Sequence, residues 1–493
     1  MSERTHSTVL WALAGLTALG IAIRFASLGV QSYHHDEVII AARVIPGNFA
    51  DMLRQVKASE SNPPLYYVLA WGWAKAFGTG EIGLRSLSAL FGAATVPVAY
   101  LIGRELAHRR AGLIAAAIAA VNPMLIWYSQ EARSYSLLVF FGALGLLFFV
   151  RALRGGQGRD LALWALSSGL ALCSHYFAVF AVAIEAAWLL FALRSQWRLV
   201  LPAIAVVAAV GLALLPLISA QVNPTHIGWI DHSPLPTRLF ETGVSFLAGE
   251  TGHVIAEPPR ERFALIPAVL IAVALLLLAL RGESRERRAA GPVLVVGAGV
   301  ALLASGAALA GKDYIVERNL LPALIPLAAV AAVGFGAGGA RRTGAVCAAL
   351  LCAYWLAFDV HVARTPNLQR PDFRDLTEQL GPPVGPRAIV TWKLAADPIQ
   401  FYLAGRSERV YSGDLPVREI DVVSKPVVAR KPPGLPPGFH PVQRLRLERL
   451  TLIRYMSPHL QHVPFHVLRD ARTGFGSNAV VADGLPFAAW GDR

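Results

Sequence analysis

Long apolar runs recur along the chain and are separated by polar connections. Each run has about the 20-residue length that an α-helix needs to cross a bilayer. The pattern therefore predicts about eleven membrane-spanning helices, and it leaves open whether region 160–193 holds one span or two. The predicted spans are 8–28, 84–103, 111–128, 134–151, 160–174, 177–193, 199–220, 263–281, 291–311, 319–338 and 343–361.

The composition supports a polytopic membrane protein of mainly α class. Of 493 residues, 55% are hydrophobic and 16% are charged, whereas a soluble chain carries about 25% charged residues. The three cysteines, Cys173, Cys347 and Cys352, lack the spacing of a zinc site or of a disulfide framework. We interpret them as small packing residues.

The net charge of +13 would indicate a nucleic-acid partner in a soluble protein. Here the basic residues are sorted into alternate short connections, which the positive-inside rule assigns to the cytoplasm. The N-terminus is then cytoplasmic and the C-terminus extracytoplasmic, and the charge attracts anionic membrane lipids instead of nucleic acid. The basic connections are 104–110, 151–159, 194–198, 281–288 and 341–342.

The long connections 29–83 and 221–262 and the tail 363–493 fall on the predicted outer side. We therefore expect a transmembrane domain over 1–362 and an extracytoplasmic domain over 363–493. Long loops are usually functional, so any chemistry is expected outside the cytoplasm.

Two parts of the outer region carry signals of local structure. Residues 62–67, with two prolines before an apolar aromatic stretch, favour amphipathic helices lying along the membrane interface. In the tail, a strand pattern at 388–392 and a shorter, weaker one at 420–423 alternate with helical patterns, which predicts a small α/β domain. The tail has neither a Gly-rich nucleotide fingerprint nor a Walker A sequence.

An adjacent acidic pair, Asp36 and Glu37, follows the first span directly. Carboxylates beside apolar residues at a membrane face are costly, and this favours a functional role. Two alternatives remain open: Asp36 caps a helix while Glu37 is solvated, or the pair binds a metal together with His34 and His35. Consecutive side chains on one element diverge, which argues against the metal.

A second cluster, Tyr128 to Tyr135, joins two spans on the outer side and contains Glu131 and Arg133. It is either a set of charges close to Asp36 or an interfacial aromatic belt with a snorkelling arginine. Three further cations, Arg85, Lys312 and Arg318, lie on the predicted outer side of the membrane, where the positive-inside rule disfavours basic residues. They bind either a substrate phosphate or lipid phosphates and local acids.

Other polar and aromatic residues near the outer ends of the spans are candidates for substrate binding. Glu185 falls in mid-membrane, where it is either functional or a neutral, hydrogen-bonded group within the bundle. The substrate-binding candidates of this kind are His35, Tyr66, Tyr128, His175 and Tyr176.

The predicted side of the membrane narrows the chemistry. No nucleotide-activated donors are present outside, so a transferase there must take an activated group from a lipid carrier. A polyprenyl-phosphate sugar meets this need. Its transfer requires a base for the acceptor hydroxyl and cations for the departing phosphate, and the outer carboxylates and arginines supply both.

Over about residues 8–361 the sequence resembles the family 39 and dolichyl-phosphate-mannose protein mannosyltransferase-like enzymes of the GT-C superfamily. The bacterial lipid A aminoarabinose transferases are similar in plan, and the tail matches only in its placement. The segments that carry the resemblance are Tyr33–Ile40, Asn62–Tyr67, Gly83–Leu87, Tyr128–Ser136 and Arg318–Pro326.

The resemblance implies a GT-C fold in a bacterial cytoplasmic membrane and inverting transfer from a polyprenyl-phosphate sugar to a glycan, lipid or protein acceptor. Asp36 matches the catalytic acidic residue of the family, and Glu37, Arg85 and Arg133 match active-site positions. Glu131 replaces the Asp often found at the second acidic position. No cofactor and no tightly bound metal are expected, because arginines can hold the leaving phosphate.

Two other classes of function compete with the transferase. A flippase or transporter for a lipid-linked sugar would favour internal repeats and deep charges; the sequence has no clear repeat, and only Glu185 lies deep. A non-catalytic scaffold would use its tail to bind an envelope partner.

Overall fold

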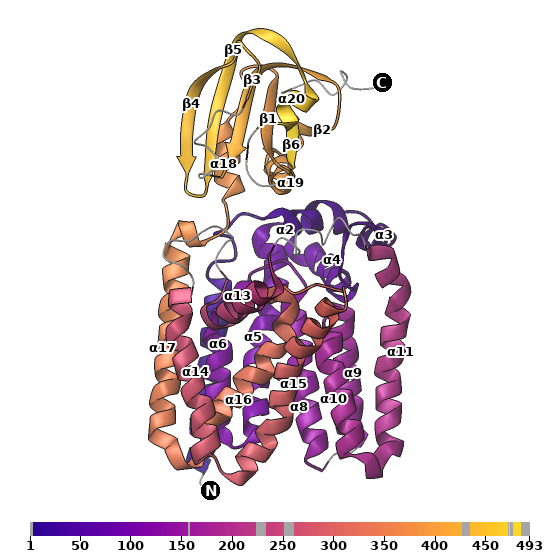
Figure 1. Ribbon diagram of the computed structural model, residues 1–493, viewed down its shortest axis with the longest axis vertical. Helices are drawn as coiled ribbons and strands as arrows, with labels where there is room; N and C mark the ends of the chain where they lie inside the picture. The colour runs from indigo at the N-terminus through magenta and orange to yellow at the C-terminus, as the bar shows by residue number, and fades with distance from the viewer. Residues whose placement is uncertain are drawn as a thin grey trace. The chain divides into compact units, whose positions relative to one another are not determined.

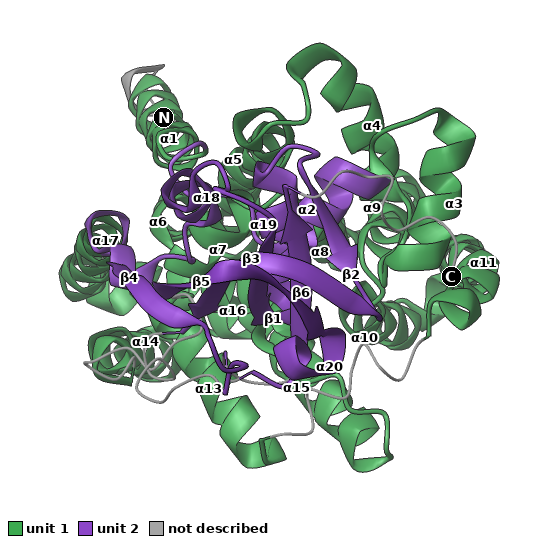
Figure 2. Ribbon diagram, turned by 90° about the horizontal axis from the view of Figure 1, so that it is seen from above, with its two compact units in different colours: residues 1–28, 44–250, 255–361 green, residues 29–43, 251–254, 362–493 purple. Residues whose placement is uncertain are grey.

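The structure is a computed structural model that describes residues 3–155, 158–222, 233–250, 261–425, 434–471, 473 and 477–484. Within these ranges, the elements before residue 380 are helices, and the strands lie in the C-terminal part (Figure 1). By its internal contacts the chain divides into two units. Of the described residues, the first unit takes 3–28, 44–250 and 261–361. The second unit takes 29–43 and those from 362 onward (Figure 2).

The first unit is a helical bundle. Its elements, in chain order, are α1 (Glu3–Phe25), α3 (Phe49–Ser59), α4 (Leu65–Phe77), α5 (Glu81–Leu106), α6 (Arg109–Val121), α7 (Pro123–Ser129), α8 (Tyr135–Leu153), α9 (Gly158–Ser174), α10 (Ala178–Ala192), η2 (Arg194–Gln196), α11 (Trp197–Gln221), α13 (Leu235–Ala248), α14 (Glu261–Arg281), α15 (Ser284–Leu309), η4 (Glu317–Ala323), α16 (Leu324–Gly336), η5 (Gly338–Ala340) and α17 (Arg341–Arg364), whose last turn passes into the second unit.

The prediction of eleven spans is confirmed only in part. Every predicted span coincides with helix, but among the described residues eight helices are long and apolar enough to cross a membrane, or nine if α6 and α7 form one bent span. The difference lies in α9 and α10, with 17 and 15 residues. At 1.5 Å per residue they are only about 25 and 22 Å long, which is short for a bilayer core of about 30 Å.

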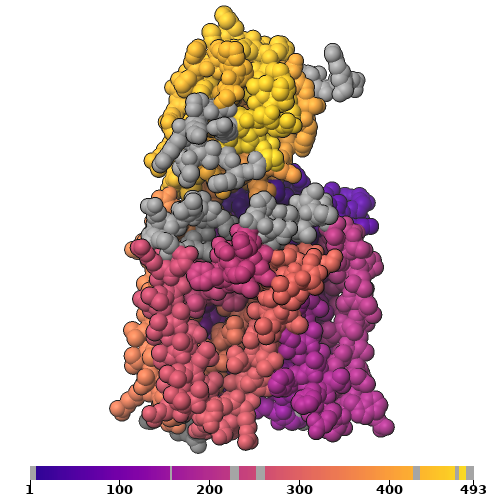
Figure 3. All heavy atoms as spheres, in the orientation of Figure 1, coloured from indigo at the N-terminus to yellow at the C-terminus, as the bar shows by residue number. Residues whose placement is uncertain are grey.

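Large apolar side chains cover the outside of the bundle, as expected for contact with lipid. On α14 and α15, Leu265, Leu280 and Leu302 are each more than 60% exposed. This face is seen in pink to salmon in Figure 3.

The arginine-rich connections gather at one end of the bundle. Glu105, at the end of α5, forms ion pairs with Arg151 and Arg154 at the end of α8, at 3.3 and 3.2 Å between the charged groups. His108 lies 3.4 Å from Glu286 at the start of α15. The helices α3, α4 and α13 lie at the opposite end (Figure 1). Such sorting of basic residues to one end is what the positive-inside rule predicts.

A buried arginine, Arg24, stabilises the break between two helices. It is not among the residues that the sequence pattern indicates. The chain bends by 54° between α6 and α7, where the Asn122 side chain accepts from the Leu125 amide. Arg24 of α1 is fully buried and donates to the carbonyls of Ala119 and Ala120, both at 2.9 Å. These carbonyls are the ones that a helix end leaves without a partner.

The deep acid Glu185 is hydrogen-bonded within the bundle. The Trp164 indole N–H donates to its carboxylate at 2.8 Å, and both side chains are buried. A cavity of about 340 Å³, which includes space open to the outside, is lined by Glu185, Ser168 and apolar residues of α8, α9, α10, η4 and α16. A satisfied Glu supports the structural interpretation of this residue.

The second unit contains the tail, which is an α/β domain as predicted. Its six-stranded mixed sheet has the order β2-β6-β1-β3-β5-β4, in which only β1 and β3 are parallel. The elements of this unit are α2 (His35–Ile39), η1 (Ile40–Val44, whose last residue belongs to the first unit), η6 (Pro366–Leu368), α18 (Phe373–Leu380), β1 (Arg387–Trp392), α19 (Lys393–Tyr402), β2 (Ser407–Val410), β3 (Asp414–Ser424), β4 (His440–Leu447), β5 (Leu450–Pro464), α20 (Phe465–Arg469) and β6 (Asn478–Asp483).

The strand pattern at 420–423, which predicts a short and weak strand, lies in a long central strand. Region 420–423 belongs to β3, which has 11 residues and pairs with both β1 and β5. Support on both edges explains why a weak local pattern still forms an extended strand. Apolar residues of α18 and α19 pack on one side of the sheet, and Leu468 of α20 belongs to a separate apolar cluster.

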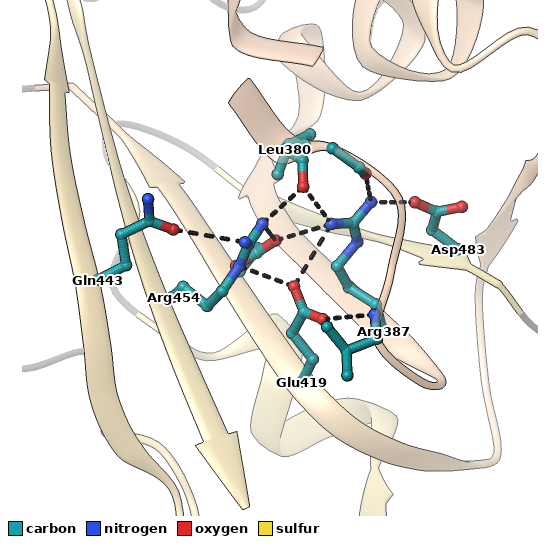
Figure 4. A network of polar contacts seen from close by, with 9 residues as sticks. Leu380, Arg387, Glu419, Gln443, Arg454 and Asp483 are labelled. Atoms are coloured by element: carbon teal, nitrogen blue, oxygen red, sulfur yellow. Dashed lines mark hydrogen bonds and ion pairs between the residues drawn. The ribbon is translucent and has the colours of Figure 1, made fainter. Parts of the chain in front are cut away.

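A buried charge network ties the sheet to the end of α18 (Figure 4). Arg387 is fully buried and pairs with Glu419, Asp421 and Asp483. Arg454 lies 2.7 Å from Glu419 and 2.9 Å from Asp421. Burial raises the pKa of Asp421 to about 6 even with Arg454 beside it. A network in which every charged side chain has a partner of opposite charge indicates a structural role.

Candidate functional site

Five charged residues from three connections of the first unit act on one or both of two side chains, Tyr128 and His175. Glu131, Glu250, Glu317 and Arg318 all act electrostatically on the Tyr128 hydroxyl. Arg133 and Arg318 act in the same way on the His175 ring. Tyr128 and His175 both contact Tyr135, with ring centroids 4.8 and 5.7 Å apart. The sequence-predicted residues Tyr128, Glu131, Arg133, His175 and Arg318 therefore belong to one cluster.

The short connection between α7 and α8 is held rigidly. The Gln130 amide donates to the carbonyls of Ile23 and Arg24 at the end of α1, both at 3.2 Å. The Ser88 hydroxyl donates to the Arg133 carbonyl at 3.1 Å. Both ends of the connection are thus fixed, and the Arg133 side chain starts from a defined position.

Arg133 forms a buried ion pair that the sequence analysis missed. Its guanidinium lies 2.9 Å from the Glu60 carboxylate, and the two side chains are 10% and 3% exposed. The Tyr67 hydroxyl donates to the same carboxylate oxygen at 2.5 Å. Burial and the Glu60 charge raise the pKa of Tyr67 well above its usual value, so that the hydroxyl keeps its proton. Glu60 stands in a polar stretch that is typical of a solvated loop, so its burial had no local signal.

His175 is held in its neutral form. Burial first, and then the charges of Arg133 and Arg318, lower its pKa to about 3. The Phe177 backbone N–H donates to Nδ1 at 3.3 Å, so the ring proton is carried by Nε2. A neutral imidazole with this tautomer is a hydrogen-bond donor that brings no charge.

A second missed residue, Gln221, joins the turn after α9 to the α3–α4 connection. Its amide oxygen accepts from the Tyr176 hydroxyl at 2.7 Å. Its amide nitrogen donates to the carbonyls of Val56 and Asn62, at 2.9 and 3.1 Å. Tyr176 therefore positions this connection, whose neighbouring residue Tyr66 is fully buried.

The three predicted outer cations differ in their exposure. Arg85 is buried and donates to the Leu28 carbonyl at 2.8 Å. Arg318 is half-buried at the start of η4, whereas Lys312 is exposed. The loop between Lys312 and Arg318 is anchored by a third missed residue, Arg238, which donates to Asp313 at 2.7 Å and holds the pKa of that carboxyl below its usual value.

The acidic pair of the first loop lies in the second unit. Glu37 is fully buried, lies 2.9 Å from the His34 ring and 4.0 Å from Arg370, and accepts from the His34 backbone N–H at 3.4 Å. The helix-cap alternative is therefore wrong in its details. His34 and not Asp36 is the N-cap, and Glu37 is not solvated.

Asp36 stands in the first turn of α2 and is partly exposed. Its neighbour His35 points to the tail, with Nδ1 2.9 Å from an oxygen of Asp397. Among the described residues, no three of the His, Cys, Asp and Glu side chains lie close enough together to hold a metal ion.

The fold resembles that of a solved protein, and part of the chain matches a family model. ArnT from Cupriavidus metallidurans in the apo state has a similar structure, with a TM-score of 0.55 and 14% identity over 92% of this chain and 98% of that one. Residues 61–219 match the family model described as dolichyl-phosphate-mannose-protein mannosyltransferase. These two findings confirm the resemblance that the sequence indicates.

Two more distant structures resemble the chain, and no curated protein sequence matches it. ArnT from C. metallidurans bound to undecaprenyl phosphate has a TM-score of 0.49 and 14% identity over 90% of this chain and 97% of that one. The Pmt1-Pmt2 complex of S. cerevisiae bound to the sugar donor has a TM-score of 0.36 and 21% identity, over 42% of this chain and 32% of that one.

Proposed function

We propose that the protein is an inverting glycosyltransferase that moves a sugar from a polyprenyl-phosphate donor to an acceptor hydroxyl or phosphate. The proposal rests on one observation: the positive charges of Arg133 and Arg318 both act on the ring of His175, which is neutral. The family match over residues 61–219 supports it, because that range contains Arg85, Glu131 and Arg133.

The proposed reaction is a single displacement. The Asp36 carboxylate removes the proton of the acceptor hydroxyl, and the acceptor oxygen attacks the anomeric carbon. The bond between that carbon and the phosphate oxygen breaks, and its electron pair leaves with the polyprenyl phosphate. Attack from the side opposite to the leaving group inverts the anomeric configuration.

The cations of the first unit are proposed to stabilise the charge that develops on the leaving phosphate. Arg85, Arg133 and Arg318 are held by defined contacts or partial burial, and guanidinium groups match phosphate geometry. The neutral His175 supplies a further N–H donor. Tyr66, Tyr128 and Tyr176 shape the surroundings of the donor, and Glu131 keeps the arginine cluster in place.

Glu37 is assigned a supporting role near the candidate base. Its carboxylate is fully buried and occupied by His34 and Arg370. A carboxylate without solvent access does not reach an acceptor hydroxyl. We propose that it fixes the start of α2, from which Asp36 and His35 project.

Replacing Arg318 should weaken donor binding, whereas replacing Lys312 should not. Arg318→Ala removes a half-buried cation of the cluster, and we expect about 10-fold weaker binding of a polyprenyl-phosphate sugar, as for loss of one charged hydrogen bond. Lys312→Ala is the matched control in the same loop, because its side chain is exposed. Donor binding measured by isothermal titration in detergent tests the difference. Equal affinity in both variants would mark Arg318 as a lipid anchor.

The proposed location is a bacterial cytoplasmic membrane, with the N-terminus inside and the tail outside. The sorting of arginines to the end of the bundle opposite α3 and α4 supports it. A periplasm-active reporter fused after Arg493 should give signal, and one fused after Arg154 should not. The reverse result would mean the opposite membrane orientation, with the acidic loop in the cytoplasm.

The flippase alternative draws on Glu185, whose bond to Trp164 favours a structural role. Proteoliposomes with a lipid-linked sugar and an envelope extract separate the functions. Sugar transfer without net translocation supports the transferase. Translocation without transfer supports the flippase, and neither activity supports the scaffold. Mass spectrometry of envelope lipids and glycans from a deletion strain identifies the acceptor.

A further inference from the structure

Residues 29–43 pack on the tail domain although they are separated from it in sequence by the whole bundle. The Tyr33 backbone N–H donates to the Tyr402 hydroxyl at 2.6 Å. The Phe373 backbone N–H donates to the Ser32 hydroxyl at 2.9 Å. Tyr33 is fully buried and its ring meets that of Phe401 edge-on, with centroids 5.8 Å apart. The segment is therefore part of the second unit.

One carboxylate of the tail joins two places on this segment. Asp397 of α19 lies 2.9 Å from the His35 ring and 2.5 Å from the Arg43 guanidinium, and its own side chain is 4% exposed. Arg409 of β2 lies 3.6 Å away on the same carboxylate. His35 and Arg43 stand on opposite sides of Asp36 in the sequence, so a single acid holds both ends of the stretch that carries the candidate base.

Asp397 remains charged although it is buried. Burial raises its pKa, but His35, Arg43 and Arg409 outweigh this effect and hold the pKa below its usual value. A buried carboxylate of this kind has no solvent to replace its partners. Its contacts with His35 and Arg43 therefore resist the opening of the segment more than exposed ion pairs do.

We propose that Asp397 is a positioning residue that fixes the orientation of the segment bearing Asp36. The catalytic part of this inference rests on the proposed function, whereas the positional part does not. Asp397 touches no reacting atom in this scheme. It acts through His35 and Arg43, and the tail thereby contributes to the reaction by holding the base in place.

The test measures hydrogen exchange and transfer in the full-length protein. In Asp397→Asn we expect backbone amides of 33–43 to exchange at least about 10-fold faster, as loss of a charged hydrogen bond predicts. Amides of β1 should be unchanged. The kcat of transfer should fall by about 10-fold or more at constant donor KM, and Asp397→Glu should restore part of it. Glu408→Gln, an exposed acid on β2, is the matched control and should behave as wild type.

A second variant guards against loss of folding. Arg43 is half-exposed, so Arg43→Ala leaves the tail core intact and should speed exchange in 33–43 alone. Combining it with Asp397→Asn should add little, because both changes break the same contact. Unchanged exchange in 33–43 in both single variants would overturn the proposal. Exchange is measured without turnover, so a wild-type protein that transfers no sugar overturns the proposed function and leaves the positional result standing.

Discussion

Asp36→Asn should reduce sugar transfer by at least about 10²-fold, which is the usual effect of removing a positioned base. The amide has nearly the shape of the carboxylate, but it does not take a proton from the acceptor hydroxyl. Asp36 is partly exposed and is not the N-cap of α2, so the helix start should survive the change. Single-turnover transfer from a polyprenyl-phosphate sugar in proteoliposomes measures the effect.

The matched control for this change is Asp51→Asn. Asp51 lies in the same predicted outer loop, in the first turn of α3, and of the described side chains its carboxylate pairs only with that of the exposed neighbour Arg54. It should retain wild-type transfer. Donor binding should be unchanged in both variants. Near-normal turnover of Asp36→Asn would remove this residue from the mechanism and direct attention to Glu131.

Arg133→Ala should lower both the stability of the protein and its affinity for the donor. The change leaves the Glu60 carboxylate buried without its cation, and breaking a buried pair in this way costs about 3–5 kcal/mol. Thermal unfolding in detergent should show a clearly lower midpoint. Since Arg133 is also proposed to contact the donor phosphate, the loss of binding and the loss of stability occur together in this variant.

A double variant separates these two effects. Glu60→Gln with Arg133→Met removes both charges, and the amide oxygen at position 60 can still accept from Tyr67. Replacing a buried pair by neutral groups is often close to neutral for stability. The double variant should therefore unfold near the wild-type midpoint and still bind the donor weakly. If it also regains donor affinity, Arg133 serves the fold alone.

The helices were predictable from the sequence because each lipid-facing helix carries its own apolar signal. The bend between α6 and α7 was not predicted, since residues 111–128 are apolar enough overall to be taken as one span. The Asn122–Pro123 pair was the available signal, because Asn caps helices and Pro favours their first turn. Arg24 was missed for a different reason. Its partners are backbone carbonyls of α6, at sequence separations of 95 and 96. A contact with backbone atoms so far along the chain cannot be predicted from the pattern of side chains.

The members of the site were predictable as residue types, but their partners were not. Arg133 and His175 stood out by their position at the ends of spans. Glu60 and Gln221, which hold Arg133 and Tyr176, had no local signal because their burial is created by tertiary packing. The grouping of residues 29–43 with the tail likewise depends on contacts between distant parts of the chain, which hydropathy and periodicity do not encode.

The contact between Arg43 and Asp397 also has a consequence for the order of synthesis. The two residues are 354 positions apart, and at about 5–20 residues per second their translation is separated by roughly 20–70 s. For most of that interval the segment around Asp36 has none of its tail partners, because translation has not yet reached Arg370. A chain that has not yet been translated as far as Asp397 therefore has the first helix but not the contacts that hold the acidic loop, and the candidate base is secured only after that residue has been made.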